Sequence, residues 1–257
     1  KKTLFNYKIT NFSNLETYAH STYLGLIFTF SLIMFVFNPF VKNFMRFTLI
    51  VFHIFIIVTL ASKAVIVSLI FLIPIYYLYN YFNYKYLIVV ILLGLFFSFN
   101  SHIKERFNDM FKTITTIQED KNLGDLETLS TNNRIIIYKN YINLIKTNFF
   151  IGHGYKNGEE IVNSKYNHNF NTHNQYLQSL FHSGVTGLVC LILFCLSPFL
   201  LIKRKNKTKY GLELVIILIL FHFLFESLLF RQWGLIFVCF SYAIYFQFFK
   251  LELKWFR

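Results

Sequence analysis

The sequence predicts an all-α fold: a polytopic bundle of transmembrane helices that carries one long polar segment on one side of the membrane. Three observations support this. The 257-residue chain is 55% hydrophobic and 21% aromatic, while only 14% of its residues are charged. The apolar residues lie in blocks, and a bilayer-spanning helix needs about 20 such residues. A polar island, residues 101–175, separates the earlier blocks from the later ones.

Seven apolar runs are expected to span the membrane, four before the island and three after it. They are residues 22–41, 43–61, 64–82, 86–99, 176–202, 212–230 and 233–249. Pro74 and Pro198 lie inside two of these runs, where lipid-embedded helices tolerate a kink. The chain does not begin with Met, so we expect further helices before Lys1. The predicted organisation is four spans in 1–100, the island in 101–175, and three spans in 176–257.

The charge distribution predicts which side of the membrane each segment faces. The net charge is +13. If the island is extracytoplasmic, the opposite side holds eleven Lys and Arg against two Glu, whereas the island holds nine cations and eight anions. This is the positive-inside pattern, and it places the C-terminus in the cytoplasm. The basic charge therefore indicates topology and does not call for nucleic acid as a partner.

Within the island, the spacing of apolar residues predicts two amphipathic helices, at residues 102–118 and 134–147. Residues 131–133 are candidates to cap the second helix. Such basic helices usually lie at the headgroup boundary or dock on the bundle. The stretches 121–133 and 155–172 are expected to be mobile loops, one of which could form a lid.

Several polar residues at the outer face are not required by topology. Each has an ordinary interpretation, such as a snorkelling side chain for Lys63 or an ion pair with Glu226 for Arg231. Taken together, fixed cations and histidines at one face suit a pyrophosphate, because Arg presents a planar fork to phosphate oxygens. The glycines around His153 could form a backbone nest for phosphate, although a plain turn is the commoner form of such a Gly-x-Gly segment. The candidate residues are Lys63, Arg134, Arg231, Glu226, His20, His173, Asn174, Gly152 and Gly154.

Neither a metal site nor a disulfide is expected. The three cysteines, Cys190, Cys195 and Cys239, all lie inside apolar runs and lack the spacing of metal ligands. No cofactor motif is present, and fixed cations can stabilise developing phosphate charge where other enzymes use Mg²⁺.

Short motifs in the chain resemble those of the O-antigen ligase and polymerase superfamily, in the same order. Residues 134–138 and 148–155 resemble its R-x-x-x-[WY] and N-P-x-x-G-x-G segments. Residues 173–178 and 184–188 resemble its H-N-x-[YL]-L-Q and G-[IV]-x-G-L segments. Three further turns are similar, at residues 61–64, 226–232 and 20–23. The chain departs from these patterns at Phe149 and Ser21, where Pro is usual, at Lys63, where Arg is commoner, and at His182, where an acidic residue is common.

The resemblance implies a multi-pass glycosyltransferase of the bacterial cytoplasmic (inner) membrane that acts on the extracytoplasmic side. Its donor would be a glycan on undecaprenyl pyrophosphate. Its acceptor would be a sugar hydroxyl, on the lipid A core for a ligase or on another lipid-linked glycan for a polymerase. No metal or cofactor would be needed. Lys63, Arg134 and Arg231 would hold the pyrophosphate, and His173 would either deprotonate or orient the acceptor hydroxyl.

Two other functions compete with this interpretation. A transporter or flippase for lipid-linked glycan would place charged residues near the bilayer midplane and show repeat symmetry. A non-catalytic scaffold would use the island as a binding module. The polar residues gather at one mouth of the bundle and no internal repeat is visible, which favours the enzyme. The partners of such a glycosyltransferase would be the two glycan substrates, the lipid bilayer and other polysaccharide-assembly proteins.

Overall fold

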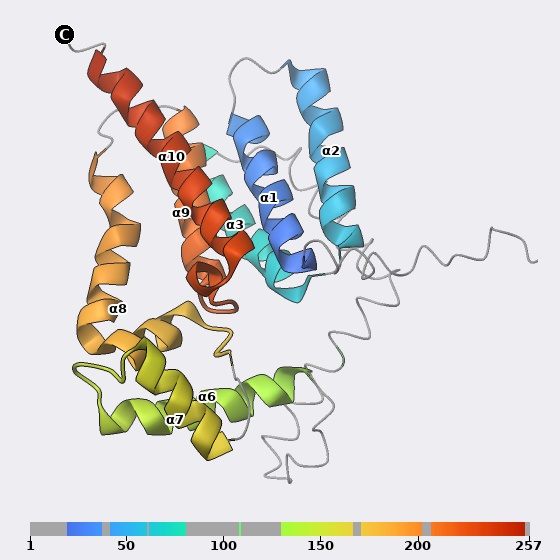
Figure 1. Cartoon of the computed structure of the whole chain (residues 1–257). Coiled ribbons are helices and arrows are strands. Elements are labelled where there is room, and N and C mark those ends of the chain that lie inside the picture. The colour runs from blue at the N-terminus through green and yellow to red at the C-terminus, as the bar shows by residue number, and fades with distance from the viewer. Residues whose placement is uncertain are drawn as a thin grey trace, which may run out of the picture. The chain divides into compact units, whose positions relative to one another are not determined.

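The computed structural model describes residues 20–37, 42–60, 62–80, 108, 130–166, 171–201 and 207–254. Every regular element in these ranges is a helix, in agreement with the predicted all-α class (Figure 1). The chain divides into two compact units. The first comprises residues 1–99 and 206–215, and the second comprises residues 100–205 and 216–257.

The described part of the first unit contains α1 (Ser21–Phe37), α2 (Asn43–Thr59) and α3 (Lys63–Asn80), together with the first part of α9 (Lys207–His222). Apolar side chains from the first three helices form its core, including Leu32 of α1, Ile57 of α2 and Val65 of α3. Polar contacts fix the helix pairing at two points. The hydroxyls of Thr22 and Ser62 lie 3.1 Å apart, and His53 Nε2 lies 3.0 Å from the Ser31 hydroxyl. A buried polar pair of this kind fixes the register of neighbouring helices.

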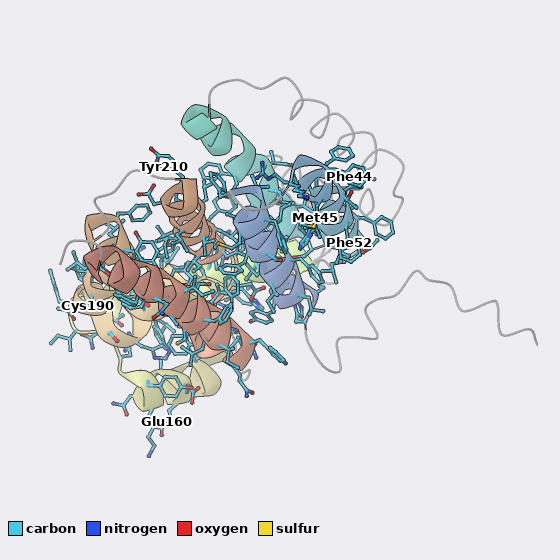
Figure 2. All side chains as sticks on the ribbon, turned by 90° about the horizontal axis from the view of Figure 1, so that it is seen from above. Phe44, Met45, Phe52, Glu160, Cys190 and Tyr210 are labelled. Atoms are coloured by element: carbon cyan, nitrogen blue, oxygen red, sulfur yellow. The ribbon has the colours of Figure 1, made fainter. Side chains whose placement is uncertain are left out.

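The outward face of α2 is strongly apolar. Phe44, Met45 and Phe52 are 85%, 50% and 54% exposed, and their side chains project from this helix in Figure 2. Exposed apolar side chains on this scale are unusual on a soluble protein and mark a surface that meets another apolar phase. The face is therefore suited to lipid.

One helix among the described residues is both long and apolar enough to cross a membrane, the stretch Gln175–Phe199. The apolar helices Ser21–Phe37, Phe44–Thr59, Lys63–Leu72 and Tyr210–His222 are shorter than a full span. The predicted spans at 22–41, 43–61 and 64–82 correspond to α1, α2 and α3, whereas the run 86–99 and, apart from residue 108, the helix at 102–118 lie outside the described residues. The predicted run 212–230 is too long. The helix α9 (Lys207–His222) ends eight residues earlier, and a turn and a short 3₁₀ helix, η4 (Leu228–Phe230), follow it.

The second unit holds α6 (Ser130–Thr147), α7 (Tyr155–Tyr166), α8 (Gln175–Leu201) and α10 (Gln232–Lys254). The first three share a core in which α6 contributes one buried stripe, α7 contributes Val162, and α8 contributes Phe181. The stripe on α6 is Ile137, Tyr141, Leu144 and Ile145. Its spacing matches the 3.6-residue helical period, which is why the sequence predicts this helix.

Two predictions for this region are wrong. The sequence predicts a loop over 155–172, but α7 occupies its first part because Val162 finds a core to enter between α6 and α8. The capping residues expected at 131–133 lie inside α6, which begins at Ser130. In both cases the local polarity of the sequence conceals a helix that packing stabilises.

The helix α8 is kinked at Gly184, which has φ 62° and ψ −161°. The loop after α6 packs into this kink. A Cβ atom at Gly184 would clash with the carbonyl group of Phe150, so only glycine fits there. The Val185 amide, which an unbroken helix would direct to residue 181, instead donates to the Phe149 carbonyl at 3.1 Å. The kink therefore depends on the loop after α6, which accepts the hydrogen bond that the broken helix cannot accept.

Candidate active site

The centre of the site is the carboxylate of Glu226, which bridges two of the predicted residues. Its Oε1 accepts a hydrogen bond from Arg134 Nη2 at 3.1 Å, and its Oε2 lies 3.2 Å from His173 Nδ1. The Glu226 side chain is 8% exposed, whereas those of Arg134 and His173 are 34% and 32% exposed. A buried carboxylate thus holds an arginine and a histidine that both reach solvent. Three segments far apart in sequence converge here.

Arg134 is held by two acceptors. Besides Glu226, it donates from Nη1 to the carbonyl oxygen of Phe225 at 3.0 Å. A guanidinium carries five N–H donors, and these contacts use two of them. Arg134 therefore has a fixed orientation, N–H donors beyond these two contacts, and a side chain that is one third exposed to solvent. A phosphate oxygen is a suitable acceptor for such a group.

His173 has a strained backbone, with φ 47°, in the left-handed region that non-glycine residues seldom adopt. Two side chains stabilise this conformation. The His173 amide donates to Asn171 Oδ1 at 3.0 Å, and the Tyr138 hydroxyl donates to the His173 carbonyl at 3.3 Å. Burial raises the pKa of Tyr138, which keeps the hydroxyl protonated as a donor. Strain that is held in place by surrounding bonds is often found at functional positions.

A buried network of neutral groups joins the segment of His173 to the turn of Glu226. The Thr172 hydroxyl lies 2.6 Å from Gln178 Oε1 and 3.0 Å from the Ser227 hydroxyl, and both Thr172 and Ser227 are fully buried. Gln175 adds two further links. Its backbone amide donates to the Phe223 carbonyl at 2.7 Å, and its side-chain Oε1 accepts from the Leu229 backbone amide at 2.9 Å. These bonds fix the distance between the imidazole and the carboxylate.

The pairing of His173 with Glu226 has a chemical consequence. An ionised carboxylate can only accept hydrogen bonds, so Glu226 favours the imidazole tautomer that carries its proton on Nδ1. The lone pair is then on Nε2, where it can accept a proton from a substrate hydroxyl. Histidine–carboxylate pairs in hydrolases work in the same way, with the carboxylate orienting the ring and stabilising its charged form. The sequence offers Arg231 as the ion-pair partner of Glu226, whereas the structure pairs the carboxylate with Arg134 and His173.

Asn174 lies next to His173 and has a structural role. Its Oδ1 accepts from the Leu177 amide at 3.0 Å, which is the bond of a residue that caps the start of a helix, here α8. Its Nδ2 donates to the Leu224 carbonyl at 3.2 Å. Arg231 lies at the start of α10, where its carbonyl accepts from the Leu235 amide, and its side chain is exposed.

Lys63 and His20 belong to the first unit. Lys63 is the first residue of α3. His20 precedes α1, and its Nδ1 accepts from the Thr22 amide at 3.3 Å, so it caps that helix. The part of these two residues in binding pyrophosphate or glycan stays a prediction.

The segment around Gly152 and Gly154 forms a turn whose backbone amides are already hydrogen-bonded, and its part in binding substrate stays a prediction. Both glycines have the positive φ that a nest requires, 77° and 73°. However, all three backbone amides of this segment already donate to carbonyl oxygens. The Gly152 amide donates to Asn148, the His153 amide donates to Phe181, and the Gly154 amide donates to His182. The last two carbonyls lie just before the kink in α8. The segment thus completes the hydrogen bonding of a broken helix, a need that the motif alone does not reveal.

Sequence reasoning missed Tyr138, Thr172, Gln178 and Ser227 as parts of the site. Tyr138, Gln178 and Ser227 lie within the motif segments 134–138, 173–178 and 226–232, and Thr172 lies next to one of them. Their position in or beside these motifs could have identified them as site residues. Among the residues that the structure describes, no three His, Cys, Asp or Glu side chains are grouped as metal ligands would be.

Apolar outward faces, a long apolar helix and a polar centre of arginine, histidine and glutamate are the features expected of a membrane protein with an enzyme-like site. The comparison with known families agrees. The family model for O-antigen ligase matches residues 47–192, which is more than half of the chain. The chain belongs to the O-antigen ligase family, and its general activity is that of a membrane glycosyltransferase of this type. No curated protein matches the sequence.

Proposed function

We propose that this protein transfers a glycan from undecaprenyl pyrophosphate to a sugar hydroxyl, as a ligase or a polymerase of surface polysaccharide. Membership of the O-antigen ligase family supports this proposal. The observation that carries it is the Glu226 carboxylate between Arg134 and His173, because it places a proton acceptor and a phosphate-binding cation on one rigid anchor.

The reaction needs one proton transfer and one displacement. The acceptor hydroxyl oxygen attacks the anomeric carbon of the donor glycan while its proton passes to His173 Nε2. The bond between the anomeric carbon and the pyrophosphate oxygen breaks, and its electron pair leaves with the pyrophosphate. Glu226 stabilises the imidazolium that forms. If His173 only orients the hydroxyl, the same geometry applies and the proton leaves with solvent.

Arg134 serves the other half of the reaction. Negative charge develops on the leaving pyrophosphate, and a guanidinium that is already oriented stabilises this charge without reorganising. Lys63 and Arg231 are the further candidate cations, and His20 is a candidate glycan contact. The sequence also predicts an extracytoplasmic site, a cytoplasmic C-terminus, and a reaction that requires no metal.

The experiment replaces His173, Arg134 and Lys63 with alanine one at a time in the cells that carry the gene, and separates the surface glycans by size on a gel. Lys139→Ala is the matched control, because Lys139 is an exposed cation on the same helix as Arg134. Membrane levels of each variant are compared by immunoblot. The control is expected to give normal glycans.

The pattern of loss identifies the acceptor. If His173→Ala leaves single glycan units on the lipid A core but removes long chains, the protein is a polymerase. If every attached unit disappears, it is a ligase. Normal ladders in the His173 and Arg134 variants, at wild-type membrane levels, would refute the proposed function. A change in Lys63→Ala alone would place the activity elsewhere in the chain.

A further inference from the structure

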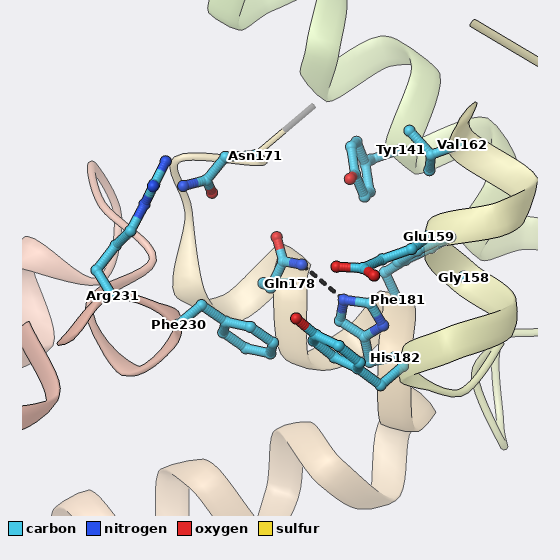
Figure 3. A pocket seen from close by; sticks show the side chains of 11 residues that line it. Tyr141, Gly158, Glu159, Val162, Asn171, Gln178, Phe181, His182, Phe230 and Arg231 are labelled. Carbon is cyan, nitrogen blue, oxygen red and sulfur yellow. Dashed lines mark hydrogen bonds between the residues drawn. The ribbon is translucent and has the colours of Figure 1, made fainter. Parts of the chain in front are cut away.

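The second unit contains a cavity to which the proposed reaction assigns no role. Its volume is about 390 Å³, within the range of roughly 300 to 1,000 Å³ that is usual for ligand sites. It is partly open to solvent, and Figure 3 shows its lining residues, which come from α6, α7, α8, the segment before α8, and the η4 turn before α10. Six of its lining residues matter for binding: Tyr155, Glu159, Asn171, Gln178, Phe230 and Arg231.

One wall of the cavity is a layer of aromatic rings. The rings of Tyr155 and Phe230 stack with their centroids 5.9 Å apart and an angle of 12° between their planes. The His182 ring stacks on Phe230 at 5.4 Å and 23°. Tyr155 is 58% exposed and Phe230 is 40% exposed, so these rings present surface to an incoming group. Exposed rings beside a cavity are a favourable site for the apolar face of a ligand.

Beside the aromatic wall, the cavity has polar side chains that include both hydrogen-bond donors and acceptors. In Figure 3 the Glu159 carboxylate reaches toward the amide of Gln178, and the side chains of Asn171 and Arg231 lie near each other at the other end. A carboxylate accepts, a guanidinium donates, and an amide does both. The neighbouring Glu159 carboxylate raises the pKa of the Tyr155 hydroxyl.

The cavity is physically continuous with the candidate active site. Asn171 lines the cavity, and the same side chain accepts the hydrogen bond from the His173 amide. Gln178 also lines it, and its Oε1 contacts the Thr172 hydroxyl that holds the His173 segment. A ligand in the cavity would therefore lie against the residues that position the imidazole.

We propose that this cavity is a subsite for one sugar ring of the glycan substrate, with Tyr155 and Phe230 as the stacking platform and Glu159 as the principal hydroxyl acceptor. The proposal rests on the proposed function and specifies where the glycan is held. A pyranose has two faces of C–H groups that pack on aromatic rings, and a rim of hydroxyls that both donate and accept. The cavity offers these two surfaces side by side.

Other ligands fit this cavity less well. Glu159 would repel a phosphate or another anion at its end of the cavity, and the cation Arg231 lies at the other end. A lipid chain would cover the charged side chains of Glu159 and Arg231 with hydrocarbon, which is costly. A neutral, hydroxyl-rich ring satisfies the polar side chains and the aromatic wall together.

The test measures glycan binding apart from catalysis. The full-length protein is purified in detergent, and saturation-transfer NMR detects binding of the oligosaccharide released by mild acid from the lipid-linked donor of the same cells. A second arm uses delipidated core oligosaccharide from cells that lack the donor, so that the two arms separate donor glycan from acceptor glycan. The variants are Tyr155→Ala and the isosteric Glu159→Gln. Phe150→Ala is the control, because Phe150 is a 73% exposed aromatic that does not line the cavity.

We expect each cavity variant to weaken binding of one oligosaccharide roughly five- to tenfold, as the loss of one stacking or hydrogen-bonding partner predicts. Phe150→Ala is expected to bind like wild type. Unchanged binding in both cavity variants would overturn the subsite. Binding by a wild-type protein that shows no transfer activity would keep the subsite and refute the proposed function, so the two failures are distinguishable.

Discussion

Replacing Glu226 by glutamine tests the proposed mechanism most directly, because it removes one charge and changes almost nothing in size. In the wild type, both carboxylate oxygens accept hydrogen bonds, one from Arg134 and one through His173 Nδ1. A glutamine amide has one oxygen and one NH₂ group. If the oxygen stays on Arg134, the NH₂ faces Nδ1, which must then act as the acceptor. The imidazole proton moves to Nε2, where the base should be free.

The size of the effect follows from this change of tautomer. The corresponding Asp→Asn substitution in serine proteases leaves the geometry intact and lowers kcat by about 10⁴-fold. We expect a similar loss for Glu226→Gln, equivalent to about 5.5 kcal/mol in the activation barrier. Folding should change far less, since removing the charge also removes the cost of keeping it buried.

The assay measures glycan transfer by purified protein in liposomes, with lipid-linked donor and acceptor isolated from the same cells. Glu226→Asp provides a control that keeps the charge and shortens the reach, and it should retain more activity than Glu226→Gln. If Glu226→Gln keeps a wild-type kcat while His173→Ala is inactive, the carboxylate does not set the tautomer and the reasoning fails.

Three further substitutions probe the scaffold of the site. Arg134→Lys keeps the charge but loses the planar fork, so kcat should fall roughly 10- to 100-fold in the same assay; an undiminished rate would contradict this. Thr172→Val should lower the free energy of unfolding by about 2 kcal/mol, visible as a lower Tm, because its buried partners lose a hydrogen bond. Gly184→Ala should cost roughly 3 kcal/mol or more, since the new Cβ would clash with the backbone of Phe150. Gly154→Ala has a similar φ and open space, so its Tm should fall less, and an equal fall would refute the steric argument.

The sequence was a good guide to the helices and to some of the site residues. The apolar runs near α1, α2 and α3 predict these helices to within a few residues at most ends, because lipid-facing helices show their character in composition. His173 and Arg134 are also recognisable, through the resemblance of their segments to the family motifs.

The partners within the site could not be predicted. Glu226 is five residues from Arg231 in sequence, so pairing them was the simplest expectation, yet the carboxylate pairs with Arg134 across 92 residues. Such a contact depends on how α6 and the turn after α9 are brought together, and no local pattern encodes that. The partners of the Gly152–His153–Gly154 amides could not be predicted for the same reason, since two of them serve carbonyls of α8 that lie far along the chain.

The bend in α8 also bears on how the protein is made. A helix whose backbone is interrupted in a lipid environment exposes unpaired amides and carbonyls, and these are costly there until another segment binds them. Here that segment, residues 148–154, precedes α8 in the chain and leaves the ribosome first. Synthesis from the N-terminus therefore supplies the covering stretch of backbone before the bent helix needs it. If residues 148–154 followed α8 in the chain, the same backbone hydrogen bonds could still form in the folded protein. The unpaired groups of the bent helix would, however, be exposed while it inserts into the membrane.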